Sequence, residues 1–181
     1  MENYVSINSD RLWARLNEVG HIGSDPRGGI SRFAWEPPYK EAVMLLIRWI
    51  KEAGLTARID TVGNVFARLE GDDPHAPAVL SGSHFDTVPQ GGCFDGLAGV
   101  MGALEALVAI KESGLPHKKP LEMVAFINEE ASQFFGRNIR KQGDMRDASG
   151  RLRFSSAQST DRSASQRCHE RIRDGGWIQK G

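Results

Sequence analysis

The segment GSHFDTVPQGGCFDG, residues 82–96, constrains this chain more than any other part of it. It places ligand-type side chains directly after an apolar strand: a His-x-Asp pair at His84 and Asp86, then Asp95 in a glycine-rich stretch. Two adjacent glutamates end the next apolar strand along the chain. Because ligands of open α/β sheets gather beyond the carboxyl ends of strands, the sequence predicts one metal site built from two strand ends.

The residue types suggest a division of roles. Imidazole nitrogen and carboxylate oxygen suit Zn²⁺ or Mn²⁺, and a carboxylate can bridge two such ions. We interpret His84, Asp95 and Glu130 as metal ligands, with Asp95 as the bridge. Adjacent side chains at a strand end point to opposite sides, which leaves Glu129 to act as general base. The Asp86 carboxylate is expected to accept the remaining ring N–H of His84 and fix its tautomer.

Plainer interpretations exist for each motif. The histidine could be an ordinary strand-end residue, with the aspartates as turn formers beside glycines and a proline. The glutamate pair could be solvated acids at the start of a helix. Cys93 could be a nucleophile, but no base is placed for it and a metal site needs none. His75 lies in a polar loop and is expected to be exposed to solvent rather than to bind metal.

Composition is typical of a globular protein. The 181 residues are 40% hydrophobic with a formal net charge of zero, which does not suggest nucleic-acid binding. The first ten residues lack the basic and apolar regions of a signal peptide, and the longest aliphatic run, residues 42–47, is too short for a membrane span. Two cysteines, Cys93 and Cys168, argue against a disulfide scaffold. We therefore expect a cytoplasmic setting without membrane contact.

Hydrophobic periodicity predicts an α/β fold with helices flanking a sheet. Helices are expected from Ser9 or Asp10 through Val19, from Pro37 to about Ala53, and from Leu97 to about Ser113, with Gly114 as a stop. Strands are expected at residues 56–60, 64–70, 78–83 and 121–127. Residues 1–135 are therefore expected to form one unit.

The sequence changes character at Gly136. Residues 1–135 hold 12 basic and 18 acidic side chains, whereas residues 136–181 hold 11 basic and 5 acidic ones. Low apolar content, high charge and no sustained periodicity favour an irregular, disordered tail. A nucleic-acid-binding tail is the alternative, but only Phe154 and Trp177 supply aromatic side chains there.

Three blocks resemble a known family: residues 28–35 (GGISRFAW), residues 82–96, and residues 126–136 (FINEEASQFFG). They are similar to the M20 metallopeptidase superfamily in its amidase branch, which holds N-carbamoyl-L-amino-acid hydrolases, β-ureidopropionases and allantoate amidohydrolases. The short, glycine-rich interval between His84 and Asp95 favours that branch, because the peptidase relatives carry a longer insertion there.

The resemblance implies a metal-dependent amidohydrolase that hydrolyses a linear, non-peptide C–N bond of an N-carbamoyl amino acid or ureido compound. It also implies two divalent ions (Zn, Mn or Co), a small-molecule substrate and a homodimer. The resemblance ends after Phe135: later metal-binding histidines and the lid or dimerisation domain cannot be read, and the surroundings of His169 do not match. We therefore expect a partial M20-type (phosphorylase/hydrolase-like) catalytic domain with an incomplete ligand set. One alternative is an inactive fragment, truncated or frameshifted after Phe135, that binds metal weakly; another is an M20 metallopeptidase.

Overall fold

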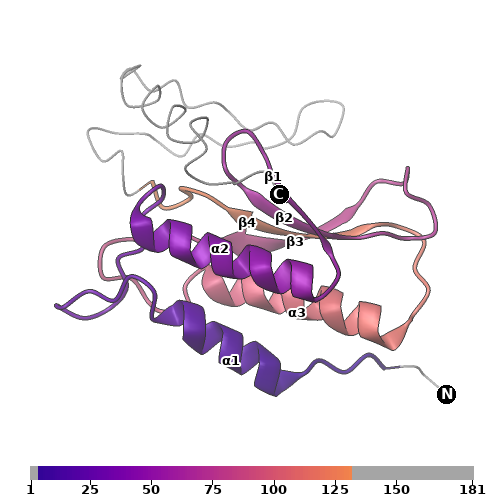
Figure 1. Cartoon of the computed structure of the whole chain (residues 1–181), viewed down its shortest axis with the longest axis horizontal. Helices are drawn as coiled ribbons and strands as arrows, with labels where there is room; N and C mark the ends of the chain where they lie inside the picture. The colour runs from indigo at the N-terminus through magenta and orange to yellow at the C-terminus, as the bar shows by residue number, and fades with distance from the viewer. Residues whose placement is uncertain (1–3, 132–181) are drawn as a thin grey trace. The chain divides into compact units, whose positions relative to one another are not determined.

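The structure, a computed structural model, describes residues 4–131, which form a mixed α/β fold (Figure 1). In chain order the elements are α1 (Ser9–Gly20), α2 (Pro37–Glu52), β1 (Thr56–Ile59), β2 (Val65–Leu69), β3 (Val79–His84), α3 (Leu97–Ser113) and β4 (Leu121–Phe126). The fold class predicted from periodicity is confirmed. The proposed boundary after residue 135 and the basic tail lie outside the described residues.

The strands form one sheet in the order β1-β2-β4-β3. The β1–β2 and β2–β4 pairs are antiparallel, whereas β3 and β4 run parallel from Val79↔Leu121 to His84↔Phe126. Helix α3 makes the crossover that a parallel pair requires. The carboxyl ends of β3 and β4 therefore meet at one edge of the sheet, and His84 is the last residue of β3.

The three helices gather along one face of the sheet (Figure 1). Helix α3 packs against β3 and β4, and α2 packs against β1 and β2. The core between the layers contains fully buried side chains from both, including Leu46, Leu104 and Met123. On the strands this burial alternates with charged side chains such as Arg68 and Glu122, which form an ion pair at 3.1 Å. The sheet thus offers its helices an apolar face, as its alternating pattern requires.

Helix α1 is fixed to α3 by a buried carboxylate. Glu105 of α3 is 1% exposed and accepts hydrogen bonds from the Asn8 main-chain N–H at 2.9 Å and from Arg11 Nε at 2.8 Å. The N-cap of α1 is Asn8, whose side chain accepts from Arg11 N, so the cap predicted at Ser9 or Asp10 is wrong by one or two residues. Capping by Asn8 is favoured because the main-chain N–H of the same residue is bound by Glu105 of α3.

Helix ends elsewhere follow the sequence signals. Proline occupies the first turn of α2, and Gly114 ends α3 in the left-handed conformation at φ +65°. Gly96, the residue before α3, also has a positive φ of +62°, but its ψ of −44° lies outside the αL conformation of Gly114. Within residues 4–131, each helix is too short or too polar to cross a bilayer.

Candidate metal centre

Three side chains from separate segments converge at the carboxyl edge of β3 and β4. His84 ends β3, Asp95 precedes α3 and Glu130 follows β4, and their ligand atoms all lie within 4.8 Å of one another. His84 Nε2 is 3.8 Å from Asp95 Oδ1 and 3.8 Å from Glu130 Oε1. These distances are too long for hydrogen bonds, so the three groups face a common space without closing it.

A glycine makes room for the His84 ring. A Cβ at Gly96 would lie 2.5 Å from both the carbonyl oxygen and Cε1 of His84, and 2.6 Å from Nδ1. Gly96 also has φ +62°, which side chains other than glycine rarely adopt. The Asp-Gly step at residues 95 and 96 therefore lets one acidic side chain and the imidazole lie close together.

The His84 ring is oriented by main chain. Its Nδ1 lies 2.9 Å from the Asp86 carbonyl oxygen. Because a carbonyl oxygen only accepts hydrogen bonds, Nδ1 carries the proton, and in the neutral ring the Nε2 lone pair then faces the two carboxylates. A ring held in this tautomer is suited to bind a metal ion through Nε2.

The Asp86 carboxylate does not hold His84, which corrects the sequence-based prediction. The side chain is fully buried and accepts the main-chain N–H groups of Glu129 at 3.1 Å and Glu130 at 3.2 Å. The chain turns after β3 so that the Asp86 carbonyl reaches the ring while its side chain points toward the loop after β4. Asp86 thus links the two strand ends that carry His84 and the glutamates.

Burial shapes the charges of this cluster. Desolvation raises the pKa of Asp86, against the lowering effect of the two N–H groups that it accepts. Desolvation also raises the pKa of Glu130, while the nearby His84 lowers it. The Glu130 side chain is 23% exposed and that of Asp95 is 54% exposed, so the cluster opens toward Asp95. Glu129 is exposed beside it and is not one of the three converging groups.

The segment that carries the glutamates departs from strand geometry. Asn128 and Ala131 have φ of +57° and +52°, which ends the extended conformation of β4. The N–H of Ile127 is accepted by the Asn64 side chain at 3.0 Å. Asn64 was not singled out from the sequence; an Asp-x-x-Gly-Asn turn between two strands was the available signal.

The block of residues 28–35 lies against the His84 segment. Ile30 and Gly91 exchange main-chain hydrogen bonds at 2.8 and 2.9 Å, and Thr87 N donates to Arg32 O at 3.1 Å. Arg32 is fully buried, and its Nε donates to the carbonyl of Phe85, the residue after His84, at 2.9 Å. Burial lowers the pKa of Arg32 to about 10. Residues 28–35 and 82–96, two of the three blocks that carry the family resemblance, are therefore hydrogen-bonded to each other.

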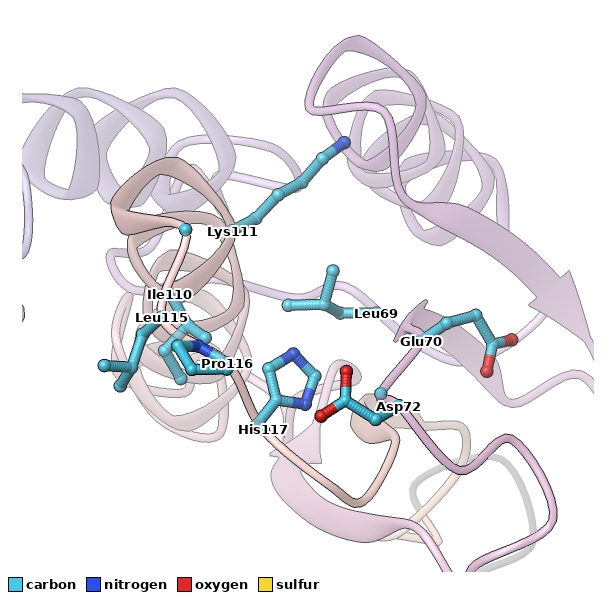
Figure 2. Close-up of a pocket in the computed structure, with 10 residues that line it drawn as sticks. Leu69, Glu70, Asp72, Ile110, Lys111, Leu115, Pro116 and His117 are labelled. Carbon is cyan, nitrogen blue, oxygen red and sulfur yellow. The ribbon is translucent and has the colours of Figure 1, made fainter.

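Other sequence candidates lie apart from this cluster. His75 is exposed, as its sequence context predicted, and Cys93 is exposed as well. A hollow at the opposite edge of the sheet is lined by Leu69, the 70–72 loop, the end of α3 and His117 (Figure 2). The His117 ring contacts its own loop there, with Nδ1 2.8 Å from the Lys119 carbonyl oxygen. Among the described residues, the His84 cluster is the one group of three ligand-type side chains.

Comparison with known proteins identifies the family. The sequence model of Peptidase family M28 matches residues 64–165, more than half of the chain and including His84, Asp95 and Glu130. The chain belongs to this family. The resemblance of the motifs to the amidase branch of the M20 metallopeptidase superfamily, with its N-carbamoyl-L-amino-acid hydrolases and allantoate amidohydrolases, is confirmed by the relatives of the chain.

The relatives of this M28 family chain are amidohydrolases. It is 41% identical over 128 residues to the N-carbamoyl-L-amino acid amidohydrolase of Geobacillus stearothermophilus, covering 71% of this chain and 31% of that protein. It is 38% identical to allantoate deiminase 2 of Glycine max over 133 residues, 72% of this chain and 27% of the relative. A crystal structure of a hydantoinase/carbamoylase family amidase from Burkholderia ambifaria superposes with a TM-score of 0.68 at 42% identity, covering 71% of this chain and 31% of that one. The chain spans about a third of the length of the curated relatives that it matches.

Proposed function

We propose that this chain carries part of the active site of a metal-dependent amidohydrolase that hydrolyses a linear, non-peptide C–N bond of an N-carbamoyl or ureido compound. The convergence of His84, Asp95 and Glu130 at one sheet edge is the observation that carries the proposal. The relatives support the substrate class, since they include an N-carbamoyl-L-amino acid amidohydrolase and an allantoate deiminase.

The chemistry of the three side chains fits a divalent ion. One neutral imidazole and two carboxylates form a donor set suited to Zn²⁺, Mn²⁺ or Co²⁺. We assign Asp95, the most exposed of the three, as the carboxylate that would be shared between two ions. When bound, such ions polarise a carbonyl and lower the pKa of water. Because the burial that raises the pKa of Glu130 disfavours its charged form, an added cation there would offset that cost.

The remaining residues handle the proton and the alignment. Glu129 is exposed beside the cluster, where its carboxylate can take a proton from water and deliver it to the leaving nitrogen. Asp86 holds the main chain of both glutamates and so fixes their position relative to His84. We assign Glu129 as the general base and Asp86 as a positioning residue.

Three ligand-type side chains also favour a second, more limited proposal for the 181-residue chain by itself. A closed four-coordinate site needs a further ligand, and a two-ion site needs several. We therefore propose that this chain binds one ion weakly and does not turn over substrate alone. The homodimer and the small-molecule substrate of the family are proposals for a protein that has the full length of the relatives.

Metal titration of the purified chain tests the ligand assignment. Calorimetry with Mn²⁺ and the visible spectrum with Co²⁺ should show metal binding by the parent chain. His84→Ala should abolish this binding because it removes a ligand, whereas Glu129→Gln should leave the dissociation constant within about threefold because it does not. His75→Ala is the matched control, since that histidine is exposed and outside the cluster. Equal binding by His84→Ala and His75→Ala would contradict the metal proposal.

Ammonia release from N-carbamoyl amino acids tests the activity of the isolated chain. We expect no turnover with Zn²⁺, Mn²⁺ or Co²⁺ at any concentration, because the described residues 4–131 bring only three ligand-type side chains together. Turnover that Glu129→Gln destroys would show that the limited proposal is wrong while supporting the base assignment.

A further inference from the structure

The turn between β1 and β2 is rigidly organised around one side chain. Asp60 Oδ1 accepts main-chain N–H groups from Val62, Gly63 and Asn64 at 3.1, 2.9 and 2.9 Å. Its other carboxylate oxygen accepts the Asn64 Nδ2 amide at 2.8 Å. Asn64 is only 3% exposed. A carboxylate partner at Nδ2 leaves Oδ1 as the free end of the Asn64 amide, turned away from the turn itself.

The free amide oxygen reaches the segment that carries the glutamates. Asn64 Oδ1 accepts the N–H of Ile127 at 3.0 Å. The β2–β4 ladder ends at Val65↔Ala125, so this side chain replaces main-chain pairing just beyond the last residue of β4. Gly63 precedes it at φ +107°, a conformation that favours glycine, and a Cβ there would lie 3.2 Å from the end of the Ile127 side chain. The turn and Ile127 therefore lie in close contact.

The glutamate segment is held at two points. Asn64 holds the N–H of Ile127, and Asp86 holds those of Glu129 and Glu130. Between these points Asn128 adopts φ +57°, a conformation that persists only when its surroundings fix it. The hydrogen bond from Ile127 to Asn64 fixes where the chain leaves the sheet. The two hydrogen bonds to Asp86 fix the main chain of the glutamates that follow.

We infer that Asn64 is a positioning residue for the Glu129–Glu130 pair, acting through the N–H of Ile127. The inference rests on the proposed function for its chemical consequence, because the pair supplies the proposed ligand and base. A residue that served only the turn would need no acceptor directed at Ile127, since Asp60 already satisfies the turn. Removal of the Asn64 oxygen should therefore disturb the glutamates more than it disturbs the hairpin.

Two variants test the amide oxygen. Asn64→Leu keeps the volume but removes the acceptor for Ile127 together with the amide donor to Asp60. Asp60 keeps its three main-chain N–H groups in this variant, so the protection of the β1–β2 amides reports whether the turn survives. The exchanged double variant Asp60→Asn/Asn64→Asp keeps every hydrogen bond, because position 60 still accepts from the main chain and its new amide donates to the new carboxylate at position 64. Val62→Ala, on the exposed side of the same turn, is the control for a general disturbance of the hairpin.

Site-resolved amide hydrogen exchange and Mn²⁺ titration of the 181-residue chain give independent results. Asn64→Leu should speed exchange at Glu129 and Glu130 about tenfold and weaken Mn²⁺ binding about threefold to tenfold, as expected for one lost buried hydrogen bond. The exchanged double variant and Val62→Ala should stay within about twofold of the parent chain in both measurements. The β1–β2 amides should keep their protection throughout.

Unchanged exchange at Glu129 and Glu130 in Asn64→Leu would overturn the inference. Equal loss in the exchanged double variant would also overturn it, because that variant retains the acceptor. If exchange rises as expected but no form of the chain binds Mn²⁺, the positioning role of Asn64 stands and the proposed metal function fails. Should Asn64→Leu fail to fold, Asn64→Ala, which removes the same acceptor without adding a branched side chain, makes the same comparison against the double variant.

Discussion

Gly96→Ala should damage the cluster, and the other end of the same helix provides its control. Gly96 precedes α3 with φ +62°, and Gly114 follows it with φ +65°. A Cβ at Gly114 meets nothing within 4 Å, whereas one at Gly96 would lie 2.5 Å from the His84 carbonyl oxygen and ring. Both substitutions place a side chain at positive φ. Gly114 lies in the αL region at ψ +16°, whereas Gly96 has ψ −44° and lies outside it, so Gly96→Ala carries at least the same backbone strain, and only it also displaces His84.

The shared strain sets a baseline for stability. An alanine held in the left-handed region costs about 1–2 kcal/mol in the free energy of unfolding. Gly114→Ala should therefore lower stability by about that amount. Gly96→Ala should add about 1–2 kcal/mol more, because the contact with the His84 main-chain oxygen cannot be relieved by a rotamer change. A total of about 2–4 kcal/mol is expected for Gly96→Ala.

Metal affinity should distinguish the two variants more sharply. Displacement of the His84 ring misaligns Nε2, so Gly96→Ala should weaken Mn²⁺ binding at least about tenfold, equivalent to about 1.4 kcal/mol. Gly114→Ala should bind Mn²⁺ as the parent chain does. Urea unfolding measures the first quantity and calorimetric titration the second. Equal losses of stability in both variants, or unchanged Mn²⁺ affinity in Gly96→Ala, would refute the steric argument.

Two further predictions concern the buried charges that support the site. Arg32→Met should lower the free energy of unfolding by about 2–4 kcal/mol, because it leaves the buried carbonyl oxygens that accept from the guanidinium without a donor. Arg27→Met, on the surface, should change the free energy of unfolding by less than about 0.5 kcal/mol in the same urea assay. Glu105→Gln should cost about 2–4 kcal/mol by removing the buried counter-charge of the α1 arginines, whereas the exposed Glu112→Gln should cost less than about 1 kcal/mol. Thermal unfolding at fixed pH checks the second pair, and equal shifts in melting temperature would contradict it.

The elements were predictable because their signals are local. The Ala- and Gly-rich apolar run of residues 97–113 and the glycine after it correspond to α3 and its cap. Short apolar runs between turn signals located all four strands, and the His-x-Asp motif begins at the last residue of β3 as expected. The N-cap of α1 was missed because Asn8 is held by Glu105, 97 residues away in the chain. Local propensity at Ser9 and Asp10 could not include that contact.

The supporting contacts of the candidate site were not predictable for the same reason. A His-x-Asp motif suggests a carboxylate partner for the ring, but the partner depends on how the chain turns after β3. In the structure the ring meets the Asp86 carbonyl, and the carboxylate meets Glu129 and Glu130. Asn64 reaches Ile127 across 63 residues of chain. Such pairings follow from strand order, which periodicity alone does not give.

The parallel pairing of β3 and β4 determines when the cluster can assemble during folding. A tight turn can close the β1–β2 hairpin, but β3 and β4 meet only after the α3 crossover has docked. His84 and Asp95 are near neighbours in sequence, whereas Glu130 arrives from beyond that crossover. Contacts of long sequence separation slow folding because loop-closure entropy is paid before they form. Binding of one ion by all three side chains would therefore require a completed crossover.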